Sequence, residues 1–431
     1  MMSAGASDRL QPTIAIIGSG PAGCYTAQFL RKKWAQAEIT IFEALPAPYG
    51  LVRYGVAADH QGTKAVTRQF DRLFERESVR FAGNVTIGRD LDFEFVAEHF
   101  DVVVLATGLR DDRALDVVQD PAARVIGAGA LVRALNGFPG DTLPRNAQGR
   151  HVRLGERLAV VGNGNVAIDV LRMLVKRADG LVGSDIDDDV LAELRPAPIR
   201  TIDVFGRSPA HEAKFDIAML RELCALPNID IAAHGIDDGG DHAVVELLMT
   251  ASAAAPDSTV AAPMTRTRVT FHFEVVPVRI VSRAGTTAVT VCNGSGCGAE
   301  EDFEVDTVVT AIGFAHAADP DATVPGEDWS GAHVYRAGWL AGSSGAMPQM
   351  RRDAKKLVDD IAARVTVGKP GFAAVQDSIA RRVVGFHDWR LIDAFECTSA
   401  PPHRVRKKVA DLVTMCAIAS GQPPEERPVG S

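Results

Sequence analysis

The sequence predicts an α/β fold in which one pattern of strand, turn, helix and strand occurs twice. The first copy starts with the apolar run from Thr13 to Ile17, which enters a turn with three glycines and then a helical apolar spacing. The second copy starts with Arg157 to Val161 and enters another glycine-containing turn. Because a helix that joins two strands in this way makes them parallel, we expect two parallel sheets in two domains.

The first turn occupies residues 18–23, and the next strand, from Glu38 to Phe42, ends at Glu43. Three glycines at this spacing allow a tight bend and let a pyrophosphate approach the N–H groups at the helix N-terminus. A carboxylate at the end of the next strand can accept hydrogen bonds from both hydroxyls of an adenosine ribose. The alternative is a glycine-rich turn without a ligand. The residues expected to contact a dinucleotide are Gly18, Gly20, Pro21, Ala22, Gly23 and Glu43.

The second turn reads G-N-G-N-V-A at residues 162–167 and is followed by a predicted helix from Ile168 to Lys176 and a strand from Thr201 to Phe205. This strand ends in Gly-Arg-Ser rather than in a carboxylate. A guanidinium and a hydroxyl favour a 2′-phosphate, which a carboxylate would repel, so NADPH is favoured over NADH. A solvated loop charge is the alternative interpretation of the arginine. The expected contacts are Gly162, Asn163, Gly164, Asn165, Val166, Arg207 and Ser208.

The composition argues against several classes of function. A formal net charge of -9 over 431 residues gives no overall attraction for nucleic acid or for anionic lipid. The longest apolar runs are strand-sized, far below the roughly 20 residues of a membrane helix. The first dozen residues contain neither an apolar core nor a basic leader. We therefore expect a cytoplasmic protein that binds neither nucleic acid nor membrane.

Six cysteines are few for this length, and no two of them form a C-x-x-C pair. Neither a disulfide framework nor a metal site is therefore expected. Cys292 and Cys297 flank a glycine-rich turn, where a redox pair or part of a metal site is the alternative to two free thiols. In a reducing cytoplasm, free thiols are the favoured interpretation.

Two other segments have recognisable patterns. The acidic stretch from Asp179 to Asp189 does not have EF-hand spacing, so we interpret it as charge at a helix N-terminus rather than as a calcium loop. Residues 232–293 alternate between apolar and polar side chains over Val244 to Leu248, Val269 to Val276 and Ala288 to Val291, which predicts an antiparallel meander. An amphipathic helix is expected from about residue 349 to residue 365.

Nearly end to end, the chain resembles the adrenodoxin-reductase-like ferredoxin-NADP reductases. The segments that look like that family's, in the family's order, are I-I-G-S-G-P-A-G-C-Y-T-A, L-V-R-Y-G-V-A-A-D-H, V-L-A-T-G, V-V-G-N-G-N-V-A-I-D-V, S-D-I, L-R-E-L, A-I-G-F and V-Y-R-A-G-W. The resemblance implies FAD and NADP(H) as cofactors and two Rossmann-like, three-layer domains. The NADP-binding domain, residues 110–314, would be inserted into a discontinuous FAD-binding domain, residues 1–109 and 315–431.

The resemblance also nominates residues that spacing alone does not reveal. His60 and Glu222 match polar residues near the flavin and nicotinamide rings, which implies proton handling or nicotinamide positioning. Taken alone, they would be a loop histidine and a surface carboxylate. The helix after residue 345 would direct its N-terminus at the flavin and stabilise its anionic reduced form. The further cofactor contacts implied are Leu51, Val52, Thr107, Gly108, Gly338, Trp339, Gly345 and Ala346.

Three departures from the family bear on specificity. Ser208 stands where a second arginine is common, and Met219 replaces a glutamate near the nicotinamide ribose. The loop after Trp339 is one residue shorter than usual and lacks a basic pair. A weaker preference for NADPH, altered nicotinamide docking or a different electron acceptor would follow.

The leading hypothesis is a monomeric reductase that takes a hydride from NADPH and passes single electrons to a ferredoxin-type iron-sulfur protein. Because a ferredoxin is acidic, we expect a basic docking face, with Arg351, Arg352, Lys355 and Lys356 or the run from His403 to Lys408 as candidates. A solvated helix face explains either run equally well. The alternatives are a flavoenzyme acting directly on a small organic substrate and a flavin-binding redox sensor.

Overall fold

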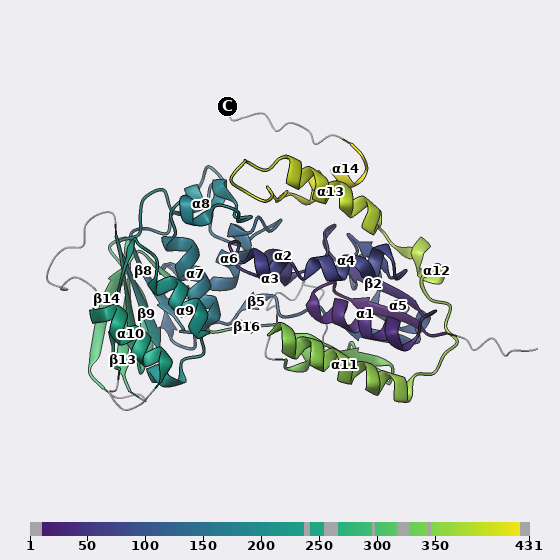
Figure 1. The fold of residues 1–431 in the computed structure, drawn as a ribbon, viewed down its shortest axis with the longest axis horizontal. Helices are drawn as coiled ribbons and strands as arrows, with labels where there is room; N and C mark the ends of the chain where they lie inside the picture. Colours follow the sequence, from purple (N-terminus) through teal and green to yellow (C-terminus); the bar gives the residue numbers. More distant parts are fainter. Residues whose placement is uncertain are drawn as a thin grey trace, which may run out of the picture.

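The computed structural model describes residues 11–236, 242–253, 266–294, 298–316, 328–343 and 346–422. Two lobes lie side by side, each built around a parallel sheet (Figure 1). One lobe contains the purple N-terminal part together with the green and yellow C-terminal part, and the other contains the middle of the chain. The two Rossmann-like units predicted from the glycine-containing turns are both present.

The sheet of the first lobe has the order β17-β4-β1-β2-β3, and every pair in it is parallel. Its strands are β1 (Thr13–Ile17), β2 (Glu38–Glu43), β3 (Arg80–Gly83), β4 (Val102–Leu105) and β17 (Val334–Arg336). Ile14 and Ile16 pack against α1 (Pro21–Lys33) and α11 (Met347–Arg364) on one face. Ala15 and Ile17 pack on the other face against α5 (Phe93–His99) and α12 (Phe372–Val375). The lobe therefore has three layers.

The sheet of the second lobe has the order β10-β11-β9-β8-β15-β7, again with only parallel pairs. Its strands are β7 (Val125–Gly127), β8 (Arg157–Val161), β9 (Thr201–Gly206), β10 (Ile229–His234), β11 (Thr267–Phe273) and β15 (Thr307–Thr310). One face is covered by α6 (Ala128–Leu135), α7 (Asn165–Val175), α9 (Ile217–Cys224) and α10 (Ala243–Ala253). This lobe holds the second predicted turn, between β8 and α7.

The third layer of the second lobe is an antiparallel sheet instead of more helices. Its strand order is β14-β13-β12-β6, and β6 (Val118–Gln119) pairs in parallel with β12. The other strands are β12 (Val275–Arg283), β13 (Thr286–Asn293) and β14 (Glu300–Val305). Apolar side chains of β12 and β13 pack against Ala159, Val161 and Phe205 of the parallel sheet.

The predicted antiparallel meander is correct only in its last part. Val244 to Leu248, predicted as a strand, lies in helix α10, where Val244, Val245 and Leu248 are buried at helical spacing. The second predicted strand is β11, which pairs in parallel with β9 and β10. The antiparallel arrangement begins with β12. Five residues of alternation were too few to distinguish a strand from one side of a helix.

Two short strands accompany the connections between the lobes. β5 (Asp111–Asp112) and β16 (Phe314–Ala315) form an antiparallel pair, so the segment that leaves the first lobe and the segment that returns to it run side by side. The remaining helices are α2 (Leu51–Tyr54), α3 (Gln61–Lys64), α4 (Thr67–Glu75), α8 (Asp188–Leu194), α13 (Phe386–Thr398), α14 (Leu412–Ala419) and the short 3₁₀ helices η1 (Asp179–Leu181), η2 (Ala210–Glu212), η3 (Gly338–Ala341) and η4 (Gln376–Ser378). Among the described residues, no helix is both long and apolar enough to cross a bilayer.

Candidate functional site

The first glycine turn connects β1 to α1 through backbone geometry that only small residues permit. Gly18 has a φ of 109°, and a Cβ atom on it would lie 2.5 Å from the carbonyl oxygen of Ala106. A Cβ atom on Gly23 would lie 2.1 Å from the carbonyl oxygen of Gly18. Gly20, at the N-terminus of α1, has open space in front of it. The turn thus leaves the helix N-terminus accessible to a phosphate group.

Glu43 ends β2 beside this turn, as expected from the sequence. Its carboxylate accepts hydrogen bonds from the backbone N–H of Ser19 at 3.0 Å, from the Ser19 hydroxyl at 2.6 Å and from the N–H of Leu45 at 3.1 Å. These three donors fix the carboxylate at the edge of the cavity described next. A ribose hydroxyl in that cavity would be a further donor to it.

A cavity of about 540 Å³ extends from this turn toward the second lobe. The nominated residues that line it are Gly18, Gly20, Pro21, Ala22, Glu43, Leu51, Thr107, Gly108, Gly338 and Trp339. Gly23 and Val52 lie behind the lining, Val52 fully buried in the core. Ala346 is the exposed residue that precedes α11, and Gly345 lies outside the described residues. The open space at Gly20 and the long lined cavity fit an FAD molecule.

The sequence missed several residues that line this cavity. They come from loops without a recognisable motif, among them Asn84, Arg89, Phe138 and Trp329. Trp329 stacks on Phe93, with ring centroids 4.5 Å apart. Loop residues of this kind enter the lining only through tertiary folding, so no local sequence signal could have identified them.

The second turn repeats the geometry of the first. Gly162 has a φ of 110°, and a Cβ atom on it would lie 2.4 Å from the carbonyl oxygen of Ala311. Gly164 has open space in front of it at the N-terminus of α7. The side-chain amide nitrogen of Asn163 is buried and has no hydrogen-bond partner among the described residues. An unsatisfied buried donor beside an accessible helix N-terminus fits a bound nucleotide.

Arg207 and Ser208 directly follow β9, next to the second turn. Gly206, the last residue of β9, has no side chain, which leaves room for the Asn163 amide. The guanidinium of Arg207 is exposed, and none of the described residues forms an ion pair with it. A cation that is exposed and free at this position is available for a 2′-phosphate.

His60 and Glu222 come from different lobes and meet in one cluster. The Nδ1 atom of His60 lies 3.4 Å from the Asp169 carboxylate, and its Nε2 atom lies 3.8 Å from Glu222. Arg172 lies 3.0 Å from Asp169 and 3.3 Å from Glu222, and it also contacts Asp59. The structure therefore brings together the two residues nominated by resemblance. It adds four charged neighbours, which the sequence did not reveal: Asp59, Asp169, Arg172 and Lys176.

Burial and mutual charge perturb the titration of this cluster. Burial, reinforced by the carboxylates of Asp59 and Glu222, raises the pKa of Asp169 to about 7 despite the nearby Arg172. Burial and the Arg172 charge lower the pKa of His60. Burial opposes ionisation of Glu222, but its hydrogen bond from Lys176 and the Arg172 charge outweigh this and lower its pKa. His60 is therefore neutral at neutral pH, and Asp169 exchanges a proton there.

Trp339 lines the cavity next to the connection between the lobes. Its ring stacks on Phe314 of β16, with centroids 4.9 Å apart and planes 20° apart. Gly338 has a φ of 65°, and a Cβ atom on it would lie 2.7 Å from the side chain of Ala22. The Gly-Trp segment thus packs against the N-terminus of α1, where the sequence led us to expect it to contact the flavin.

One of the two predicted basic docking runs is not a surface patch. Arg404 pairs with Asp188 and has a side chain that is 3% exposed, and Lys408 is 1% exposed and pairs with Asp185. Arg406 pairs with Asp393 and Glu396. The interpretation of residues 403–408 as a docking face was therefore wrong for Arg404, Arg406 and Lys408, which pair with carboxylates of the protein itself, whereas His403 and Lys407 are exposed. In contrast, all four candidates in α11, Arg351, Arg352, Lys355 and Lys356, are exposed.

The acidic stretch is a helix start only in part. Asp187 caps α8 and accepts hydrogen bonds from the N–H groups of Asp189 and Val190, as predicted. Asp185 is instead a buried partner of two lysines.

Cys292 is buried as a free thiol, and Cys297 lies outside the described residues. No cluster of potential metal ligands occurs in the described part of the chain.

Comparisons with known proteins agree with this geometry. Residues 12–204 match the sequence profile of the pyridine nucleotide-disulphide oxidoreductase family. A cindoxin reductase of Citrobacter braakii is 38% identical over 430 residues, which cover 95% of this chain and 92% of the relative. The NADPH-ferredoxin reductase FprA of Mycobacterium leprae is 30% identical, over 95% of this chain and 98% of its own.

Solved structures extend the similarity to the whole fold. FprA of Mycobacterium tuberculosis in complex with NADPH superimposes with a TM-score of 0.82 at 28% identity, covering 95% of this chain and 100% of the other. The chain therefore belongs to the adrenodoxin-reductase-like family of ferredoxin-NADP reductases, flavoproteins with two Rossmann-like domains that use FAD and NADPH.

Proposed function

We propose that this protein takes a hydride from NADPH and delivers single electrons to a small, acidic, ferredoxin-type iron-sulfur protein. The observation that carries the proposal is the path of residues 51–60. Leu51 and Tyr54 of this segment line the FAD cavity, and His60 reaches Asp169 in α7, the helix that begins at the second turn. One short segment thus connects the two nucleotide sites. Bound FAD supplies the chemistry that links a two-electron donor to a one-electron acceptor.

Each set of nominated residues has a proposed task. The first turn and Glu43 bind FAD, while Asn163, Arg207 and Ser208 bind NADPH. His60 and Glu222 orient the nicotinamide and hold a proton near it. The proposed domain boundaries follow the connections: residues 1–109 and 315–431 bind FAD, and residues 110–314 bind NADPH. The antiparallel pairing of β5 with β16 at these positions supports the boundaries.

The basic residues of α11 are the proposed docking face for the acceptor. Arg351, Arg352, Lys355 and Lys356 are exposed, and Met350 of the same helix lines the FAD cavity. An acidic partner on this face would therefore lie close to the flavin site, and charge would guide its approach. The relatives' names specify redox partners, ferredoxin for FprA and cindoxin for the Citrobacter enzyme. Since one chain provides both nucleotide sites, we further propose that the protein is a monomer. We also propose that it works in the cytoplasm.

The decisive experiment is anaerobic reduction in two stages. The protein with its FAD is mixed with NADPH or NADH in a stopped-flow instrument, and an oxidised ferredoxin is then added to the reduced enzyme. We expect bleaching of the flavin absorbance with NADPH, followed by its recovery as the ferredoxin is reduced. A flavin that stays reduced after ferredoxin is added would contradict the proposed acceptor, and absence of bleaching would contradict the whole proposal.

A direct reaction with a small organic substrate is the second candidate. It is favoured by the loop after Trp339, which is shorter than the family's and lacks its basic pair. Under this alternative, an organic substrate is turned over with NADPH while an added ferredoxin stays oxidised. The same two-stage experiment, with product analysis, therefore separates the two functions.

A further inference from the structure

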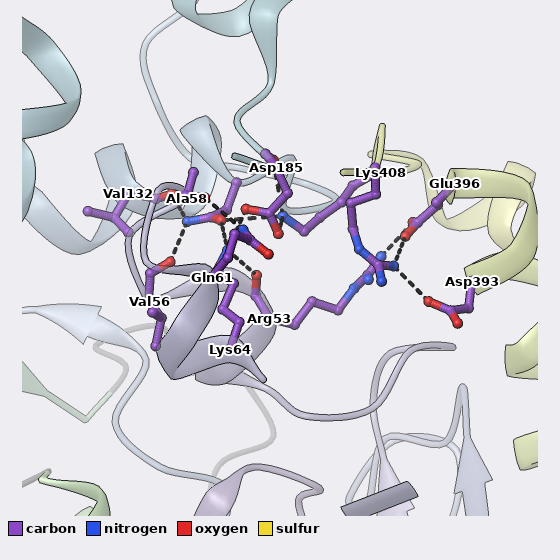
Figure 2. Close-up of polar contacts among 12 residues, drawn as sticks. Arg53, Val56, Ala58, Gln61, Lys64, Val132, Asp185, Asp393, Glu396 and Lys408 are labelled. Carbon is purple, nitrogen blue, oxygen red and sulfur yellow. Dashed lines mark hydrogen bonds and ion pairs between the residues drawn. The ribbon is translucent and has the colours of Figure 1, made fainter. Parts of the chain in front are cut away.

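A buried polar cluster lies where three distant parts of the chain meet (Figure 2). The ammonium groups of Lys64 and Lys408 each lie 2.7 Å from a different oxygen of the Asp185 carboxylate. Both lysines also donate to the side-chain oxygen of Asn136, at 2.6 and 3.3 Å. All four side chains are buried. Lys64 ends α3 in the first lobe, whereas Asn136 and Asp185 belong to the second lobe.

Lys408 belongs to a C-terminal strap, which we define as residues 401–409. The strap runs along residues 183–184 of the second lobe with two backbone hydrogen bonds, from Gly183 N–H to the His403 oxygen and from Val405 N–H to the Ser184 oxygen, at 2.9 and 3.1 Å. Its other end is tied to the first lobe. Arg406 lies 3.1 Å from Glu396 in α13, and the same carboxylate pairs with Arg53 in α2 (Figure 2). The strap therefore connects both lobes.

The cluster also holds the backbone that leads to His60. The amide group of Asn136 donates to the Val56 oxygen at 3.0 Å, and the N–H of Asp185 donates to the Ala58 oxygen at 3.2 Å (Figure 2). In the next residue, Asp59, the carboxylate accepts from Lys176 at 2.7 Å. All three donors come from the second lobe. The position of residues 56–60 relative to the NADPH site thus depends on the residues that Lys408 contacts.

The cluster contains two lysines but one carboxylate. Lys64 and Asp185 alone would form a neutral pair, so Lys408 adds a second cation to a buried site with one carboxylate. Burial lowers the pKa of Lys408 well below its usual value, and the Lys64 charge lowers it further. A buried cation beyond the neutral pair costs desolvation energy. Charged or neutral, the Lys408 side-chain nitrogen lies within hydrogen-bond distance of Asp185 and of Asn136, and it therefore holds both side chains in a single arrangement.

We propose that Lys408 is a positioning residue for hydride transfer, which holds the His60 segment against the NADPH-binding lobe through Asp185 and Asn136. The inference rests on the proposed function, since it concerns the step in which NADPH reduces the flavin. Lys408 touches neither nucleotide turn, so its action is indirect. A shift of about 1 Å between reacting groups can lower a rate on the order of a hundredfold.

The test replaces Lys408 with methionine, which has an unbranched side chain that is one atom shorter and lacks the amine, and which leaves the neutral pair of Lys64 and Asp185. Lys407→Met is the matched control, because the Lys407 side chain is 54% exposed and its ion pair within the described residues is with the exposed Asp189. Anaerobic stopped-flow mixing over a range of NADPH concentrations gives the limiting rate constant of flavin reduction and the Kd of NADPH separately. We expect Lys408→Met to lower the rate constant roughly tenfold or more, with the Kd unchanged, and Lys407→Met to match the wild type.

Hydrogen exchange provides a second measurement that does not depend on activity. The amide of Asp185 bonds to Ala58 in the other lobe, so a peptide containing residue 185 reports the contact between lobes. We expect faster exchange there in Lys408→Met and unchanged exchange in β1. A purely structural role would lower Tm and leave the rate constant of the folded enzyme unchanged, which would overturn the proposal. A slower rate constant with unchanged exchange at residue 185 would overturn it as well.

A second variant covers the case in which Lys408→Met does not retain FAD. Asn136→Leu keeps Lys64, Asp185 and Lys408 and removes the hydrogen bonds of the Asn136 side chain, among them the bond to Val56, so it should also slow flavin reduction at constant Kd. Wild-type rates in this variant would contradict the inference. Failure of the wild-type protein to be reduced by NADPH would instead contradict the proposed function. The two failures are therefore distinguishable.

Discussion

Replacement of Arg207 by alanine should weaken the preference for NADPH over NADH. The guanidinium is exposed beside the second glycine turn, and none of the described residues pairs with it. Alanine therefore breaks no ion pair within the described structure. NADH has no 2′-phosphate, so only the reaction with NADPH should lose an interaction.

The expected size follows from the energy of a charge-assisted hydrogen bond, about 1.5 to 3 kcal/mol. Because Arg207 is exposed, solvent screens the interaction and the lower value applies. About 1.4 kcal/mol corresponds to a factor of ten, so kcat/KM for NADPH should fall roughly tenfold. The value for NADH should stay within about twofold of the wild type.

Steady-state reduction of ferricyanide measures both kcat/KM values without a protein acceptor. Arg150→Ala is the control, because Arg150 is an exposed arginine of the same lobe in the loop before β8. It should change neither value. An unchanged ratio of NADPH to NADH specificity in Arg207→Ala would refute the assignment of the 2′-phosphate to this residue.

Three other predictions concern separate parts of the site. Glu43→Gln keeps the side-chain shape but removes the charge that accepts ribose hydroxyls, so FAD should dissociate on the order of tenfold more readily, as measured by fluorescence of released flavin; equal retention would contradict the role of Glu43. The pKa of Asp169 is raised to about 7 in the folded state, so the folded protein loses stability as pH rises from about 4 to about 7. Asp169→Asn removes this titration, and its Tm should therefore depend less on pH in this range than the wild-type Tm. Parallel curves of Tm against pH for the two proteins would contradict this. Joint replacement Arg351→Glu and Arg352→Glu should slow ferredoxin reduction roughly tenfold at low salt and leave ferricyanide reduction unchanged; a salt-independent wild-type rate would exclude charge-guided docking.

Short sequence patterns correctly predicted those strands whose structure is determined by neighbouring residues. β1 and β8 have the bounds predicted from their apolar runs, because a buried strand followed by a glycine turn is specified within a dozen residues. The same reasoning failed at residues 244–248, where alternation over five residues also fits a helix that is buried on one side. Helix and strand periods become distinct only over longer segments.

The ionic clusters could not be predicted because their members are far apart in the sequence. Lys408 hydrogen-bonds to the backbone oxygen of Asp185, 223 positions earlier in the chain. Seen alone, the run of cations around Lys408 looks like a solvated surface, and the acidic stretch around Asp185 looks like a helix start. Only the tertiary fold brings these opposite charges together and buries them. His60 and Glu222 were nominated by resemblance alone, since neither has a distinctive local pattern.

The antiparallel pairing of β5 with β16 has a consequence for engineering of the protein. Because Asp111–Asp112 and Phe314–Ala315 lie side by side, the 201 or so residues between them leave and re-enter the first lobe at nearly the same point. Excision of that stretch would leave two chain ends close enough to be joined by a short linker. The pairing therefore marks the place at which the corresponding lobe of a related reductase would be joined in a hybrid enzyme built to test nucleotide preference.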